Sequence, residues 1–195
     1  MNKLIASILC VLLLLPASAA MAGTPTDTVT KTVDGVLALL KDGSLSKHQR
    51  RDKMRALIND GFDFRAMSQR TLATNWKKAT HEQQDRFVKL FAQLIQNSYV
   101  GKIEAYTDET VKYANESVKD KRAVVDTFIV TKTIRIPINY KMVLRGSEWK
   151  VYDVVIEEVS MVSSYRSSYR SIVKKEGFDG LFVKMEAKIK QLTAS

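Results

Sequence analysis

The sequence predicts an α+β fold, in which a curved four-stranded antiparallel sheet packs against several helices. Two changes in the apolar pattern indicate this fold. Apolar residues recur at helical spacing from Val29 to Ile103 and then alternate with polar residues, at a period of two, from Ile134 to Arg145. Helical spacing returns after Met161. Helices on one face of such a sheet either close tightly on it or leave a space, and periodicity alone does not separate these outcomes.

The N-terminal third is predicted to be helical. A first helix is expected over residues 24–40, capped by Thr26 or Asp27, and a basic second helix over residues 44–58. An Asp-Gly pair follows each helix and ends it. A short helical turn is expected over residues 64–70. The first helix carries an apolar stripe of Val29, Val33, Val36, Leu37 and Leu40.

A longer helix is predicted to begin at Thr80, because Thr80-His81-Glu82-Gln83 has the pattern of a capping box. Its apolar face consists of Phe87, Leu90, Phe91, Leu94, Ile95, Ile103 and Tyr106. Four strands should follow, over residues 111–118, 122–131, 134–145 and 149–156. Pro137 lacks a backbone donor and is therefore expected at a sheet edge or a bulge, where it would help the sheet to curl around a cavity.

The helix after the last strand pairs aromatic and basic residues one turn apart. Tyr165 and Tyr169 form one pair, and Arg166 and Arg170 form the other. Two interpretations stay open. The rings and guanidinium groups could line a pocket for an amphiphile with an anionic end, or the tyrosines could be core residues beside solvated arginines. Gly177 and Gly180 then precede a final helix.

Residues 1–22 are predicted to be a secretory signal peptide, followed by a single domain over residues 23–195. Lys3 precedes an apolar run that is too short to span a membrane, and small residues follow Pro16. Cleavage removes Cys10, so neither disulfides nor thiol chemistry is expected. The formal charge falls from +10 to +9 with the loss of Lys3. Trp76, Lys77 and Lys78 could stack and bind nucleic acid, but export argues against that partner.

Motifs for catalysis or metal binding are weak. Ser44 with Lys47, and Ser171 with Lys174, match Ser-x-x-Lys without the accompanying motifs of acyl-enzyme serines. His48 and His81 have no metal-ligand spacing, so no metal is expected. The alternative function is an exported enzyme acting on a small apolar substrate. It would use Asp126 or Asp153, beside Tyr140 or Tyr152, for proton transfer.

Two stretches, residues 67–106 and 149–181, resemble the toluene-tolerance family, the MlaC proteins. The Trp-Lys-Val-Tyr-Asp strand that begins at Trp149 and the Ser-Tyr-Arg-Ser segments of the following helix carry most of the likeness. Two residues depart from the family pattern. Glu158 stands where glycine is expected, which puts the backbone of that bend in doubt, and Tyr169 stands where phenylalanine is common.

The resemblance implies a nuclear-transport-factor-like fold with a deep hydrophobic cavity, and a periplasmic phospholipid carrier that is not an enzyme. It also implies phospholipid as cargo rather than a cofactor, a monomer, and two membrane partners. These partners are an outer-membrane lipoprotein–porin complex and the MCE-domain subunit of an inner-membrane ABC transporter. Expected tail contacts are Phe87, Leu90, Phe91, Leu94, Tyr106, Ile129, Tyr140, Met142, Val151 and Met161. Tyr165, Arg166 and Tyr169 are expected near the mouth of the cavity.

Overall fold

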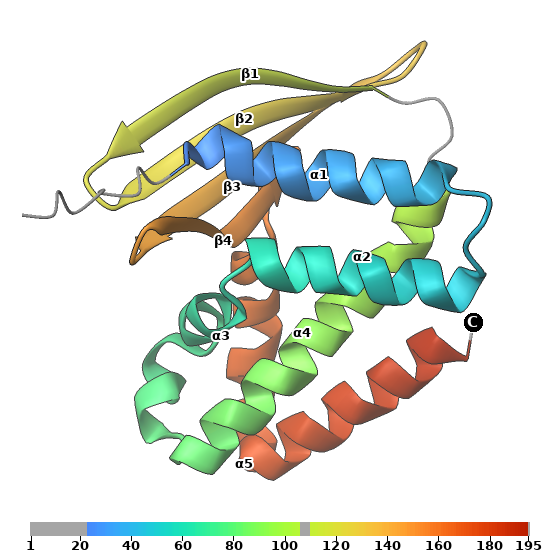
Figure 1. The fold of residues 1–195 in the computed structure, drawn as a ribbon. Coiled ribbons are helices and arrows are strands. Elements are labelled where there is room, and N and C mark those ends of the chain that lie inside the picture. The colour runs from blue at the N-terminus through green and yellow to red at the C-terminus, as the bar shows by residue number, and fades with distance from the viewer. Residues whose placement is uncertain (1–22, 106–109, 195) are drawn as a thin grey trace, which may run out of the picture.

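The computed structural model describes residues 23–105 and 110–194 and confirms the α+β class. The predicted signal peptide lies outside these residues. The helices are α1 (Pro25–Lys41), α2 (Lys47–Gly61), α3 (Phe64–Leu72), the 3₁₀ helix η1 (Ala73–Lys78), α4 (His81–Glu104) and α5 (Met161–Thr193). The strands are β1 (Thr110–Lys119), β2 (Arg122–Val130), β3 (Arg135–Arg145), β4 (Glu148–Ile156) and β5 (Val159–Ser160). Figure 1 shows the sheet above the helices, with α1 nearest to the strands.

Capping residues set the helix starts. Thr80 and Gln83 form the predicted capping box of α4. The expected cap of the first helix was wrong: Thr24 caps α1, and Asp27 is the reciprocal partner at the third helical position. Pro25 favours this earlier start, because a proline at the first helical position loses no intrahelical hydrogen bond. The second helix starts at Lys47 rather than Ser44, since Ser46 and Gln49 make its capping box.

The strands form one antiparallel sheet in the order β1-β2-β3-β4-β5. The two-residue β5 makes five strands where four were expected. The expectation for Pro137 was also wrong, because β3 is an inner strand and Pro137 pairs with Phe128 without a register shift there. The carbonyl of Pro137 accepts a hydrogen bond from Glu157 on the β4 side, where the ladder with β4 has already ended at Ile156. The missing donor therefore costs no ladder bond.

Helices α1 and α2 pack closely as a hairpin. A Cβ atom at Gly61 would lie 2.4 Å from the hydroxyl of Thr32, and one at Gly35 would lie 2.9 Å from a methyl group of Leu57. A larger residue at either position would require the facing side chain to move. On the other side of the molecule, α4 and α5 enclose a core of fully buried side chains that includes Phe87, Phe91 and Phe182. The predicted final helix continues α5 through a kink at Gly177, whose φ is +70°.

The turn between β4 and β5 shows the backbone conformation of Glu158, which the sequence left open. Glu157 and Glu158 have φ values of +48° and +67°, which lie in the left-handed region. Side chains with a Cβ atom are strained there by about 1–2 kcal/mol per residue, whereas glycine is not. Glu158 therefore adopts a backbone conformation that favours glycine, the residue that the family pattern predicts at this position.

We therefore expect Glu158→Gly to raise the free energy of unfolding by about 1 kcal/mol, since relief of strain exceeds the added freedom of the unfolded chain. Urea unfolding measures this change. Glu158→Ala is the matched control, because it removes the carboxylate and keeps the strained Cβ atom. An equal rise in the free energy of unfolding of both variants would show that the effect comes from removal of the charge. That result would contradict backbone strain as the cause.

Candidate functional site

An apolar pocket of about 420 Å³ lies between the sheet and helices α1, α2 and α4. This volume falls within the range of roughly 300–1,000 Å³ that is typical of ligand sites. Its apolar lining comes from Val29, Val33, Val36, Leu37, Ile58, Phe62, Ile95, Ile103, Val111, Ile129, Ile136, Ile138, Val151, Val154, Ile156 and Met161. Thr32, Gln96, Tyr99, Lys102, Thr127 and Tyr140 complete it. The helices therefore do not close completely on the sheet.

Three uncharged polar side chains of the lining are hydrogen-bonded within the protein. The Thr32 hydroxyl donates to the carbonyl of Thr28, and the Thr127 hydroxyl donates to the carbonyl of Ile138. The Gln96 amide donates to the side chain of Asn59, at 2.8 Å. Because the wall is mostly apolar and these three side chains already have partners, it offers little to water, so the pocket favours an apolar guest.

The pocket reaches the end of the sheet where β1 begins and β2 ends. Val111 and Ile129 line it there, and they face each other across the β1–β2 ladder. Lys102 is the only charged residue among the described residues of the lining, and it is exposed. Its ammonium group lies 5.3 Å from the ring centroid of Tyr99. This end therefore meets solvent and carries a positive charge.

Polar side chains join α2 to α4 along one side of the pocket. Arg51 binds Glu104 through two hydrogen bonds of 2.7 and 2.8 Å. Arg55 donates to Asn97, one helical turn further along α2. The Arg51 hydrogen bonds lower the pKa of Glu104. Together with the Gln96–Asn59 bond, these contacts hold the α1–α2 hairpin against α4.

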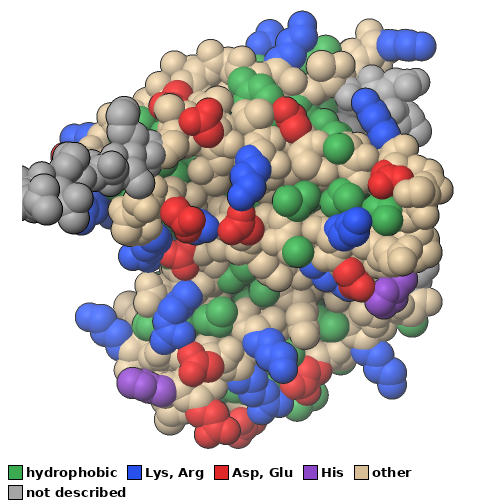
Figure 2. All heavy atoms as spheres, viewed as in Figure 1, with side chains coloured by type: hydrophobic (Ala, Val, Ile, Leu, Met, Phe, Trp, Pro, Cys, Tyr) green, Lys and Arg blue, Asp and Glu red, His purple; other side chains and the backbone are tan. Residues whose placement is uncertain are grey.

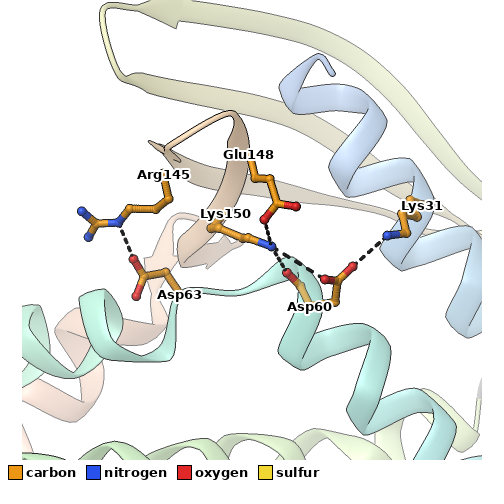
Figure 3. A network of polar contacts seen from close by, with 6 residues as sticks. All are labelled: Lys31, Asp60, Asp63, Arg145, Glu148 and Lys150. Atoms are coloured by element: carbon orange, nitrogen blue, oxygen red, sulfur yellow. Dashed lines mark hydrogen bonds and ion pairs between the residues drawn. The ribbon is translucent and has the colours of Figure 1, made fainter. Parts of the chain in front are cut away.

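A second polar network joins α1, α2 and β4 at the opposite end (Figure 3). The Asp60 carboxylate accepts a hydrogen bond from Lys31, at 2.8 Å, and lies 3.7 Å from the ammonium group of Lys150. The hydrogen bond from Lys31 lowers the pKa of Asp60, and Lys150 adds to this effect. Lys150 also pairs with Glu148 at 2.8 Å. Elsewhere on the face drawn in Figure 2, basic and acidic side chains are interspersed, as expected for a solvated surface.

The residues that were expected to contact acyl tails fall into two groups, one in the pocket lining and one in the core. Ile129, Tyr140, Val151 and Met161 line the pocket. Phe87, Leu90, Phe91, Leu94 and Met142 are buried in the core and do not belong to the lining. Tyr106 lies outside the described residues. Lipid contact at all of these positions remains a prediction.

The residues expected at the mouth pack against the aromatic core. Tyr169 meets Phe87 edge-on at 5.8 Å, and Tyr165 meets Phe91 edge-on at 5.3 Å. Burial raises the pKa of Tyr169. Arg166 is half-buried, and its Nε donates to the carbonyl of Arg70 at 2.8 Å. Of the two interpretations of this helix, the geometry favours core tyrosines, while Arg166 is bound rather than solvated.

The α1 stripe contributes a wall of the pocket that was not assigned to the lipid. Val29, Val33, Val36 and Leu37 were predicted only as the apolar face of a helix. Ile136 and Ile138 were likewise predicted only as one face of a strand. The alternation that placed Tyr140 toward the interior places these two isoleucines on the same face, so this signal could have identified them.

The acids of the alternative enzyme serve structural roles. Asp153 is 5% exposed and accepts hydrogen bonds from the Ser160 hydroxyl and the Val162 amide, at the start of α5. Asp126 accepts hydrogen bonds from Asn115 and Asn139 across the sheet. Neither carboxylate belongs to the lining of the apolar pocket. These contacts give no support to proton transfer on a bound apolar substrate.

The remaining motifs do not form a site. His48 is exposed and pairs with Asp52, and His81 is the first residue of α4. Within residues 23–105 and 110–194, no group of three His, Cys, Asp or Glu side chains is placed to hold a metal ion. No helix in this part of the chain is both long and apolar enough to cross a membrane.

Comparison with known proteins places the chain in a family. The family model described as MlaC protein matches residues 30–187. The chain belongs to the MlaC family. It is 26% identical over 132 residues to the intermembrane phospholipid transport system binding protein MlaC of Haemophilus influenzae, covering 63% of this chain and 60% of that relative. It is 24% identical over 182 residues to toluene tolerance protein ttg2D of Pseudomonas putida, covering 88% and 83% of the two chains.

A solved structure shares the fold of this MlaC family member. The phospholipid-binding protein of Ralstonia solanacearum, in complex with a phospholipid, superposes with a TM-score of 0.80. It is 25% identical, and the match covers 88% of this chain and 99% of the other. The shared fold thus extends over nearly the whole of the described domain.

The Arg51–Glu104 pair gives a pH-dependent prediction. Because the pKa of Glu104 is lower in the folded protein than in the unfolded chain, the pair stabilises the fold at neutral pH. This contribution is lost as the pH falls from about 4.3, the ordinary glutamate value, through the lowered one. Arg51→Gln should reduce the free energy of unfolding by about 1 kcal/mol at pH 7, with a smaller reduction in acid.

Urea unfolding across this pH range measures the difference. Lys53→Gln removes the same charge from an exposed position of α2 and should leave stability nearly unchanged. A deficit in Arg51→Gln that stays constant into strong acid would show that the ion pair is not its cause.

Proposed function

We propose that this chain is a periplasmic phospholipid carrier that holds acyl tails in the apolar pocket. It would shuttle lipid between outer-membrane and inner-membrane transport complexes and so maintain the lipid asymmetry of the outer membrane. The observation that carries the proposal is the pocket itself, whose walls are mostly apolar and whose Thr32, Gln96 and Thr127 side chains are hydrogen-bonded within the protein. Membership of the MlaC family and the lipid-bound Ralstonia relative support the same cargo.

The free energy of hydrating the tails explains why a carrier is needed. An acyl tail of about 15 methylenes costs about 12 kcal/mol when it is exposed to water, at about 0.8 kcal/mol per methylene. A pocket that removes the tails from water cancels most of this cost. The exposed Lys102, at the solvent end of the pocket, suits a phosphate-bearing headgroup that remains in water.

Direction of transport must come from partners, because a bilayer interior and an apolar pocket are nearly equivalent solvents for a tail. The proposed partners are an outer-membrane lipoprotein–porin complex and the MCE-domain subunit of an inner-membrane ABC transporter. The carrier itself would act as a monomer without a cofactor and without catalysing a reaction. Its work is binding and release.

Adjacent residues of β2 offer a test of the pocket. Ile129 lines it, whereas Val130 lies on the opposite face of the same strand. Ile129→Glu should reduce the phospholipid that co-purifies with natively prepared protein at least about tenfold, because an unpaired carboxylate is costly beside a tail. Val130→Glu should retain the lipid. Mass spectrometry of extracted lipid, with circular dichroism to check folding, gives the result.

Two outcomes would oppose the carrier function. Wild-type protein that co-purifies without phospholipid, and takes up none from vesicles, would remove the proposed cargo. Equal lipid content in the two folded variants would place the cargo outside this pocket.

A further inference from the structure

Three arginines from separate elements gather at the end of the sheet opposite to Lys102. Arg70 is in the last turn of α3, Arg122 begins β2 and Arg145 ends β3. Arg122 lies opposite Val143 in the ladder, two residues before Arg145. The turns β1–β2 and β3–β4 are both at this end, whereas the pocket reaches the other end at Val111 and Ile129.

The guanidinium group of Arg70 is fixed in place. It lies 4.0 Å from the ring centroid of Tyr152, and its Nη1 donates to the carbonyl of Ala66. The backbone carbonyl of Arg70 accepts the hydrogen bond from Arg166, which ties the end of α3 to α5. Tyr152 is the extra residue of a bulge, since its neighbours Val151 and Asp153 pair with consecutive residues of β3. The bulge and the stacked ring therefore present the arginine in one orientation.

The charge of this cluster is poorly balanced. Asp63 accepts a hydrogen bond from Nε of Arg145 at 2.7 Å, and its other oxygen caps α3 at the Ala66 amide. The terminal nitrogens of Arg145 point away from Asp63 in Figure 3. Among the residues that the structure describes, no carboxylate lies within ion-pair distance of Arg70 or Arg122.

The surroundings add further positive charge. Lys119 and Lys121 flank Asp120 in the adjoining turn, while Glu148 lies opposite Arg145 in the β3–β4 ladder and pairs with Lys150. Burial lowers the pKa of Arg70, and the charges of Arg122 and Arg145 lower it further, against the opposing effects of Tyr152 and Asp63. Like charges held together in this way are relieved when an anion binds between them.

We propose that Arg70, Arg122 and Arg145 dock an acidic segment of another protein through its aspartate and glutamate carboxylates. Planar, oriented guanidinium groups match carboxylates through paired hydrogen bonds. A membrane surface fits less well, because such surfaces usually recruit exposed bulky apolar residues together with basic ones. Of the exposed large apolar side chains in the described ranges, only Val118 lies at this end. A partner docked here leaves the solvent end of the pocket uncovered.

The test uses a fluorescein-labelled oligoglutamate peptide and fluorescence anisotropy at about 0.1 M salt, where distant charges are screened. The cluster variant carries Arg70→Gln, Arg122→Gln and Arg145→Gln. The control carries Lys77→Gln, Lys174→Gln and Lys175→Gln, which remove the same charge from exposed positions. We expect the cluster variant to bind the peptide at least about tenfold more weakly than the control does. Both variants should retain co-purified phospholipid, so a loss of lipid would concern the pocket instead.

The single variant Arg122→Gln controls for a folding defect, because Arg122 is exposed and its replacement should leave the thermal transition unchanged. This variant should still bind the peptide more weakly than the wild type does. Absence of peptide binding by the wild type, or equal affinities for the cluster and control variants, would overturn the proposal. The proposal would also be overturned if the cluster variant bound the peptide as well as the control but lost binding to vesicles of phosphatidylcholine and phosphatidylglycerol. The cluster would then bind membranes rather than an acidic protein segment.

Discussion

The apolar hollow between α1 and the sheet is the constraint on which the rest of the structure depends. Without a guest, water would lie against the apolar side chains that line this pocket of about 420 Å³, which is unfavourable in proportion to the apolar area exposed. Domains of this kind have total stabilities of about 5–15 kcal/mol. A guest that fills the hollow therefore contributes to the fold itself. Under the proposed function, acyl tails bound in the hollow would extend the apolar core.

Polar contacts hold the wall of this hollow without filling it. The α1–α2 hairpin is joined internally by the close approach of Gly61 to Thr32, where a larger residue would displace the Thr32 side chain. It is joined to α4 by Arg51–Glu104 and to β4 by the network around Asp60. The apolar stripe of α1 is consequently free to face the pocket. In the other half of the molecule, edge-on and stacked rings at Phe87, Phe91 and Tyr169 close the core completely.

Local signals in the sequence predicted most of the fold. The Thr80–Gln83 capping box located the start of α4, and the alternation from Ile134 to Leu144 located β3 and its interior face. Pro137 was misplaced because its environment depends on where the neighbouring β4 ends, which no local pattern records. The short β5 was not predicted because no glycine marks the turn before it. Glu157 and Glu158 form that turn in a backbone conformation that glycine usually adopts.

The candidate site was harder to predict than the fold. Periodicity shows which face of an element is apolar, but not which element that face meets. Phe91 and Val33 both lie on apolar helical stripes, yet one is sealed in the core and the other faces the pocket. The family resemblance predicted a cavity, but only the three-dimensional arrangement shows which apolar faces of the helices and strands line it. The arginine cluster is similar, since Arg70, Arg122 and Arg145 are distant in sequence and come to the same end of the sheet only after folding.

The most direct measurement is the thermal stability of delipidated protein before and after phospholipid is restored. Protein stripped of lipid by unfolding and then refolded should melt at a lower temperature than native protein, and added phospholipid should restore the transition, as expected for a ligand that binds only the folded state. Glycerophosphocholine, a headgroup without tails, should have no effect. An unchanged melting temperature in the stripped protein, with no uptake of added phospholipid, would contradict the claim that acyl tails complete the core.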